Sequence, residues 1–313
     1  LPICSLYSNF GLLSGLLFTC LITISFGSAD KNEAPTVSEA EEVSTHLPQQ
    51  VHSIDINKTY DLAGEVVPMN MDTRERLDRE LSVNAYWHSS TLLNIKMAAK
   101  YFPTIERVLA EEGVPDDFKY LAVAESNLRN VRSGAEAKGF WQFRKLTGKE
   151  WKLEINNEID ERYHIEKSTR AACKYLKHMK KRFGTWSNAA AAYNVGPTSF
   201  NKQRQAQGEE SFYNMNINAE TSRYLFRIIA IKEIMTNPQV YGFYLDSTDK
   251  YALQDQVEYI TIRSSIPNLS KWAHDKGISY RTLKYFNPWL IAGELTVKRN
   301  TYKIAIPHNK TFY

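Results

Sequence analysis

The chain of 313 residues has little cysteine, little glycine and no cluster of metal-binding side chains. Two of its three cysteines, Cys4 and Cys20, lie in an apolar N-terminal stretch, so a processed chain would keep only Cys173. A single thiol cannot form an internal disulfide, and burial must then stabilise the core. The seven histidines are scattered without ligand spacing, and no glycine-rich phosphate loop is present. We therefore expect no metal and no cofactor.

Charge is distributed unevenly along the chain. Residues 1–29 carry none, residues 30–55 carry a net charge of −5, and the remainder carries +9. A basic body fits an anionic or polar polymeric partner, and it also fits simple solubility. Recognition of nucleic acid would need more basic clusters with interleaved aromatic residues. We therefore expect no nucleic-acid partner, although a nucleic-acid or membrane-surface binder remains an alternative that rests on the +9 body alone.

The N-terminal residues have the pattern of a targeting segment rather than of a folded domain. Residues 10–26 form a largely apolar run, and small residues up to Ala29 then precede the charged Asp30. This pattern predicts an export signal over residues 1–29. A run of 17 residues is at the lower limit for a spanning helix, so an uncleaved membrane anchor is the alternative. Residues 30–72 are polar and aperiodic, which predicts a flexible linker.

Residues 73–245 show mainly helical periodicity, which predicts an α-helical domain. A first helical run is interrupted at Pro103, and Asp116 or Asp117 is expected to cap the next helix. The helices expected from the apolar spacing are 73–112, about 117–128, 166–183, 187–193 and 219–235. The short helix 187–193 is expected to stop at Gly196-Pro197. The fold class is therefore mainly α over this part of the chain.

Residues 254–310 have a different pattern. Two β-rich segments, 257–263 and 302–306, flank two short helical patterns, 269–276 and 280–286. This β-α-α-β order predicts a separate small α+β domain.

Glu125 is the most informative single residue. Helical spacing places it on a stripe with Leu121 and Leu128, and an ionised carboxyl on an apolar face is costly. Desolvation is expected to raise its pKa and keep it protonated near neutrality, as a general acid requires. A structural glutamate, hydrogen-bonded in the core, is the alternative. The nearby Trp141 and Gln142 combine an aromatic face with an amide, a combination that suits a sugar ring.

Four successive motifs resemble those of the lytic transglycosylase (SLT domain) family over about residues 114–235. They are Glu125-Ser126, the segment 133–139, Gly139-Phe140-Trp141-Gln142-Phe143, and Ala192-Tyr193-Asn194-Val195-Gly196-Pro197. The segments 160–162 and 220–224 are similar to a membrane-bound branch of that family. The resemblance implies a lysozyme-like fold, peptidoglycan glycan strands as the partner, and export to the periplasm or cell envelope. Glu136 and Arg144-Lys145 depart from the family pattern.

The resemblance also implies a mechanism with one carboxyl, Glu125, as both acid and base. It would cleave the bond between N-acetylmuramic acid and N-acetylglucosamine and leave 1,6-anhydro ends. The residues expected to orient the sugar or the acid are Ser133, Gln142, Tyr193, Asn194 and Tyr224. If Glu136, Asp160, Glu161 or Glu220 supplied a second carboxyl, lysozyme-type hydrolysis would be the alternative. A non-catalytic cell-wall binding protein is a third reading. The sequence does not indicate an oligomeric state.

Residues 259–307 are similar to a LysM domain, a small β-α-α-β module that binds N-acetylglucosamine polymers. The supporting residues are Tyr259 to Ile262, Leu269, Trp272-Ala273, Leu283, Asn287 and Ile304 to Pro307. The usual Gly-Asp-Thr-Leu turn is replaced by residues 265–269. A structural appendage without sugar affinity is therefore the alternative.

Overall fold

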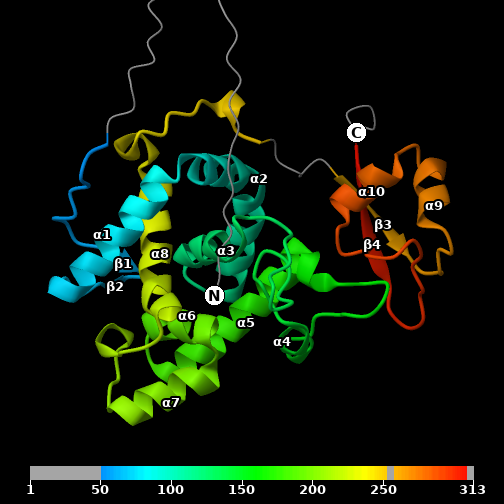
Figure 1. Cartoon of the computed structure of the whole chain (residues 1–313). Coiled ribbons are helices and arrows are strands. Elements are labelled where there is room, and N and C mark those ends of the chain that lie inside the picture. The colour runs from blue at the N-terminus through cyan, green and yellow to red at the C-terminus, as the bar shows by residue number, and fades with distance from the viewer. Residues whose placement is uncertain (1–50, 252–256, 309–313) are drawn as a thin grey trace, which may run out of the picture. The chain divides into compact units, whose positions relative to one another are not determined.

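The computed structural model describes residues 51–251 and 257–308 (Figure 1). The expected export signal and residues 30–50 of the expected linker lie outside this part of the chain. Within the described ranges, no helix is both long and apolar enough to cross a membrane. The α-helices before the C-terminal module are α1 (Met71–Tyr86), α2 (His88–Glu112), α3 (Lys119–Ser126), α4 (Lys145–Glu150), α5 (Ile165–Phe183), α6 (Trp186–Val195), α7 (Pro197–Gln207) and α8 (Ala219–Thr236).

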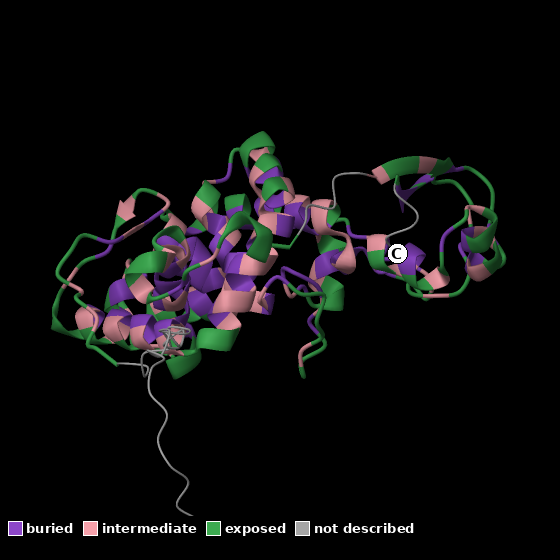
Figure 2. Ribbon diagram, turned by 90° about the horizontal axis from the view of Figure 1, so that it is seen from above, coloured by how far each residue is buried: buried purple, intermediate pink, exposed green. Residues whose placement is uncertain are grey.

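Helix α8 organises the core of this helical region. It packs against α1, α3 and α6, while α5 packs against α2 and α6 (Figure 1). Buried residues gather where these helices face one another (Figure 2). The largest fully buried side chains include Phe118, Trp141, Phe212 and Phe226. The prediction of a mainly α fold is confirmed.

The helical run near the N-terminus breaks at a different place from the predicted one. Helix α2 continues through Pro103, and the break falls at Trp87, whose φ of −82° and ψ of 61° end α1. The expected interruption at Pro103 is therefore wrong. Proline removes a single N–H donor, and the residues beyond it, including Ile105 and Leu109, are fully buried and hold the second half of the helix against the core.

The linker prediction is wrong for residues 51–72. Strands β1 (Asp61–Leu62) and β2 (Glu65–Val66) form an antiparallel hairpin. Leu62 is fully buried, and the carboxylate of Glu65 accepts hydrogen bonds from the backbone N–H groups of Trp186 and Ser187 at 2.7 and 2.9 Å. The polar composition suggested a tether, but a few buried side chains and one capping carboxylate fasten this segment to the first turn of α6.

Helix α3 begins and ends differently from expectation. A short 3₁₀ turn, η1 (Asp116–Phe118), precedes it, and no side chain caps it. Asp117 instead accepts hydrogen bonds from the backbone N–H of Ala63 and from Nζ of Lys232. The helix stops at Ser126 because Asn127 adopts a left-handed conformation with a φ of 51°. Leu128 is buried, as predicted, but from the loop rather than from the helix.

Two helices were not predicted. Helix α6 ends at Val195 with Gly196 as its C-cap, so the expected stop at Gly196-Pro197 is confirmed. Helix α7 then begins at Pro197, because proline is well suited to the first position of a helix. Helix α4 is one short segment without an apolar stripe, so periodicity could not reveal it.

The C-terminal module has the predicted β-α-α-β order. Its elements are β3 (Val257–Ile262), α9 (Leu269–Asp275), α10 (Tyr280–Phe286) and β4 (Tyr302–Pro307), with β3 and β4 antiparallel and Tyr259 opposite Ala305. Asn287 is buried, and its side chain bonds the backbone of Leu283 and both the N–H and the carbonyl of Ala305. This one amide ties α10 to β4.

The segment between α4 and α5 also contributes to the core of the module. Ile159 is 1% exposed and packs with the apolar side chains of the module. The N–H of Asp160 donates to the carbonyl of Trp289 at 2.9 Å, and the N–H of Ile291 donates to the carbonyl of Glu158. The backbone at residues 158–160 therefore belongs to the segment between α4 and α5 and also forms hydrogen bonds with the C-terminal module.

Candidate active site

Glu125 lies in the last turn of α3 and faces α8. The hydroxyl of Tyr224, a residue only 2% exposed, donates a hydrogen bond to Oε1 of Glu125 at 2.5 Å. Burial raises the pKa of Glu125 to about 7, against the opposing effects of the Tyr224 hydroxyl and the positive charge of Arg227. The expected rise in the pKa is confirmed, and desolvation is its largest cause. Such a carboxyl can release and recover a proton near neutrality.

Glu220, one of the acids considered as a second carboxyl, influences the Glu125–Tyr224 pair. It lies one turn before Tyr224 on α8, and its negative charge contributes to the raised pKa of Glu125. Its carboxylate is 59% exposed and pairs with Arg227 at 3.1 Å. Arg227 thus links the two carboxyls electrostatically. Sequence reasoning missed Arg227, although its position three residues after Tyr224 places both on one face of the helix.

The other acids considered as a second carboxyl are held by basic partners. Glu136 pairs with Arg132 on the surface, and Glu161 pairs with Lys167. Asp160 is 1% exposed and bonded to Arg162. Each of these ion pairs explains the presence of its acidic residue by a structural role. No group of three or more metal-binding side chains is found within residues 51–251 and 257–308.

Tyr193 approaches the carboxyl from α6. Its hydroxyl donates to the backbone carbonyl of Trp141 at 2.6 Å. Burial raises the pKa of Tyr193 well above 10, and the nearby charge of Glu125 raises it further. Tyr193 therefore stays neutral and acts as a hydrogen-bond donor beside the acid.

Gln142 lies in the segment opposite α6, with a left-handed φ of 48°. Its Nε2 donates to the carbonyls of Gly139 and Val131 at 2.8 and 3.2 Å. These bonds bring the ends of the loop together and fix the side chain. The segment is joined to the acid's own helix, because the hydroxyl of Ser126 donates to the carbonyl of Phe140 at 2.9 Å.

Ser133 and Asn194 have local partners. The Ser133 hydroxyl accepts from the N–H of Ala137 at 3.1 Å and so organises the turn of the loop. Asn194 accepts from the hydroxyl of Thr221 at 2.9 Å, which ties α6 to α8. The structure thus joins Tyr224 directly to Glu125 and brings Tyr193 near it, while Ser133, Gln142 and Asn194 are bonded to the surrounding backbone or to Thr221.

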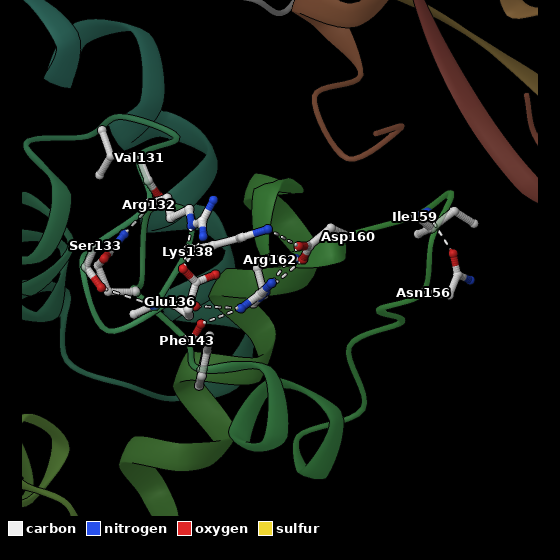
Figure 3. A network of polar contacts seen from close by, with 12 residues as sticks. Val131, Arg132, Ser133, Glu136, Lys138, Phe143, Asn156, Ile159, Asp160 and Arg162 are labelled. Carbon is white, nitrogen blue, oxygen red and sulfur yellow. Dashed lines mark hydrogen bonds and ion pairs between the residues drawn. The ribbon is translucent and has the colours of Figure 1, made fainter. Parts of the chain in front are cut away.

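Arg162 is a residue whose position sequence reasoning did not explain. It is 3% exposed, and its Nη1 donates to the carbonyls of Glu136 and Phe143, both at 3.1 Å (Figure 3). Its Nε and Nη2 bind both oxygens of Asp160 at 2.8 and 2.6 Å. One guanidinium therefore fastens both ends of the segment that carries Gln142. In the sequence, only the spacing of Asp160 and Arg162, two residues apart, indicated that these side chains could form an ion pair.

Gly139 shows how closely the backbones approach at this point. Its φ is +79°, and a Cβ on it would lie 1.9 Å from the carbonyl oxygen of Arg162. Only glycine fits here, both for its conformation and for the space it leaves. Gly139, Arg162 and Asp160 together set the position of the segment 136–143, which forms the wall beside Glu125.

Two family models match the chain. The "Transglycosylase SLT domain" matches residues 102–216, and the "Soluble lytic transglycosylase C-terminal LysM-like domain" matches residues 258–310. The chain is 30% identical over 227 residues to membrane-bound lytic murein transglycosylase D of Escherichia coli (strain K12), which is 71% of this chain and 48% of that relative. The values are the same for the protein of that name in Escherichia coli O6:H1. The chain thus spans about half the length of these curated relatives.

A solved structure gives a weaker likeness. It is an inactive mutant of the lytic transglycosylase Slt from Pseudomonas aeruginosa, with 17% identity and a TM-score of 0.34. The match covers 49% of this chain and 26% of that one.

Proposed function

Because the chain carries a transglycosylase SLT domain and a LysM-like domain of the soluble lytic transglycosylase type, we propose that it is a lytic transglycosylase of peptidoglycan. Its substrate is the glycan strand, cut between N-acetylmuramic acid and N-acetylglucosamine. The observation that supports this most is the desolvated carboxyl of the half-buried Glu125, whose pKa is about 7 and which accepts a hydrogen bond from the Tyr224 hydroxyl.

In the first step, protonated Glu125 acts as the general acid. It gives its proton to the oxygen of the glycosidic bond while the bond from C1 to that oxygen breaks. The N-acetyl group of the same sugar stabilises the positive charge that develops at C1. The raised pKa keeps a useful fraction of Glu125 protonated at neutral pH.

In the second step, ionised Glu125 acts as the base. The Tyr224 hydroxyl and the charge of Arg227 stabilise this carboxylate, since both lower its pKa. Glu125 takes the proton from the 6-hydroxyl of the sugar, whose oxygen forms a bond to C1. The product is a 1,6-anhydro end, and the enzyme regains its proton. Attack within one sugar avoids the entropic cost of capturing a water molecule.

The remaining residues position the reacting groups. Tyr193 fixes Trp141 through its hydroxyl and stands beside the acid. Gln142 and Ser133 shape the loop that faces the N-acetyl group, and Asn194 holds α6 at its distance from α8. We assign substrate contact to Gln142 and Tyr193, and supporting roles to Ser133 and Asn194.

One observation favours a second candidate, a lysozyme-type hydrolase. Glu220 lies on α8 one turn from Tyr224, and its charge affects the pKa of Glu125, so it could activate a water molecule. In the lytic transglycosylase, Glu220 has no part in the chemistry.

Mass spectrometry of fragments released from purified sacculi separates the candidates. We expect anhydro ends from the wild type and from Glu220→Gln, and no fragments from Glu125→Gln. Reducing ends that disappear with Glu220→Gln would assign hydrolysis instead. A wild type that binds sacculi without releasing any fragment would identify a non-catalytic cell-wall binding protein.

The C-terminal module and the cellular location complete the proposal. We assign to the LysM-like module the binding of N-acetylglucosamine polymers, and to the whole protein a place in the cell envelope, where such polymers occur. Sedimentation of the protein with chitin beads or with sacculi tests the first assignment. If removal of residues 254–313 reduced sedimentation with chitin beads and with sacculi equally, this result would support sugar binding by the module.

A further inference from the structure

A cavity of about 650 Å³ lies between helix α2 and the C-terminal module. Residues of α2 and the segment 163–166 line one side, and α10 with the strands β3 and β4 lines the other. Its volume is within the range of small-molecule sites in proteins. Glu125 is not among its lining residues, so the cavity is a different place from the site described above.

The charge of this cavity is mostly of one sign. The basic side chains that line it are Lys100, Arg107, Arg129, Lys284 and Lys303. Glu166 is its one acidic lining residue, and its carboxylate already pairs with Arg107 and with Arg170, the latter at 2.9 Å. The cavity therefore offers a positive potential, focused by low-dielectric walls.

Lys100 is the residue that most needs an explanation. It is 8% exposed, yet it makes no ion pair with a carboxylate of the described residues. Its Nζ donates to the hydroxyl of Tyr285 and lies 4.3 Å from the centre of that ring and 5.0 Å from that of Tyr101. These neighbours are neutral and leave the charge uncancelled. Burying a cation without a counter-charge is unfavourable, and such positions are common where a ligand supplies the charge.

Lys284 provides a second, half-buried cation from the opposite side. Its Nζ donates to the backbone carbonyls of Leu290 and Ala292, again without a carboxylate among the described residues. Burial lowers the pKa of Lys284, so an anion placed beside it would be favoured. The two ammonium groups come from different parts of the chain and line one cavity.

Aromatic side chains form much of the remaining wall. Tyr101, Phe140 and Trp289 line the cavity, and the last two are almost fully buried. Such a wall suits a ligand with apolar portions between its charges, rather than a small inorganic ion.

We propose that this cavity binds the acidic peptide that is attached to peptidoglycan strands. The identity of this ligand rests on the proposed function, whereas its chemistry, a carboxylate-bearing peptide of a few residues, follows from the cations and the aromatic wall. The peptide carries free carboxylates on a short chain with aliphatic portions. Arg129 and Asn130 line the cavity only four and five residues after Glu125, so a strand at the catalytic carboxyl can extend its peptide toward it.

Calorimetric titration of the N-acetylated tripeptide N-acetyl-L-Ala-γ-D-Glu-L-Lys, which has a net negative charge, into the Glu125→Gln variant of the whole chain tests the proposal. We expect binding that weakens about tenfold in Lys100→Gln and in Lys284→Gln, and at least threefold when the carboxylates of the peptide are amidated. Lys181→Gln, an exposed lysine on α5, is the matched control and should bind as the parent does. Arg129→Gln changes an exposed residue of the cavity and should weaken binding without any risk to folding.

Three results would overturn the proposal. They are the absence of binding to the parent protein, unchanged affinity in Arg129→Gln and folded Lys100→Gln, and equal affinity for the amidated peptide. Lys100→Met adds a second readout, because loss of an uncompensated buried charge should leave the melting temperature equal or higher while binding is lost. A fall in both the melting temperature and the peptide affinity would mean that Lys100 only stabilises the packing of the C-terminal module. Since the probe contains no sugar, peptide binding by a protein that fails to cleave sacculi would refute only the proposed function.

Discussion

The Tyr224 hydroxyl donates to Oε1 of Glu125 at 2.5 Å and so joins α8 to α3 across 99 residues of sequence. This bond lowers the pKa of Glu125, while burial raises it to about 7. Burial prevails, but the hydroxyl keeps the ionised form accessible. The pair therefore allows one carboxyl to exist in both protonation states at neutral pH.

The pH dependence of cleavage should report this carboxyl. If protonated Glu125 starts the reaction, kcat/KM should fall about tenfold for each pH unit above about 7. Initial rates of fragment release from sacculi between pH 5 and 9 provide the measurement. A rate independent of pH up to pH 9 would contradict the acid role.

Removing the hydroxyl should move that profile. In Tyr224→Phe the bond that favours the carboxylate is lost, so the pKa of Glu125 should rise and the alkaline limb should shift to higher pH. We also expect a slower maximal rate, because the base form is less stabilised. Tyr213→Phe, whose hydroxyl contacts Ser187, is the control and should leave the limb in place.

Glu125→Gln should make the protein more stable at alkaline pH. The raised pKa means that the folded carboxyl costs nothing below pH 4.5, where both states are protonated. The cost grows as the unfolded state ionises and is complete above about pH 7, where it amounts to about 3 kcal/mol. Urea unfolding at pH 5 and pH 8 measures the difference. We expect a larger gain in the free energy of unfolding at pH 8, and an equal gain at both would contradict this.

Arg162→Lys should disturb the wall beside the acid. Lysine keeps the charge toward Asp160 but cannot also reach the carbonyls of Glu136 and Phe143 with the same geometry. We expect a loss of about 2 kcal/mol in the free energy of unfolding and a lower kcat. Arg132→Lys, on the exposed side of the same loop, should change stability by less than about 0.5 kcal/mol. Equal behaviour of the two variants would show that Arg162 does not hold the wall.

Gly139→Ala should be far more harmful than Gly134→Ala. A Cβ at residue 139 would lie 1.9 Å from the backbone oxygen of Arg162, whereas nothing lies within 4 Å of one at residue 134. We expect a loss above about 3 kcal/mol for the first and near neutrality for the second. Thermal melting of both variants checks this, and similar melting temperatures would refute the close approach.

The sequence predicted the elements that depend on local pattern. Apolar spacing was sufficient for α5 and α8, and the alternation of residues 302–306 was sufficient for β4, because a buried face imposes its period on the chain. It also predicted the raised pKa of Glu125, since a carboxyl among apolar neighbours is desolvated in any fold that buries them. The end of α3 at Asn127 was missed, because a left-handed residue interrupts a stripe that continues on either side of it.

Relationships between distant segments were decided by the tertiary structure alone. The sequence gives no distance between Tyr224 and Glu125, nor between Arg162 and the carbonyl of Phe143, because such contacts depend on how the helices pack. Hydrophobic periodicity determines which face of an element is buried, and it says nothing about the element that covers that face. The hairpin at residues 61–66 illustrates the same limit, since only docking against α6 distinguishes it from a polar linker.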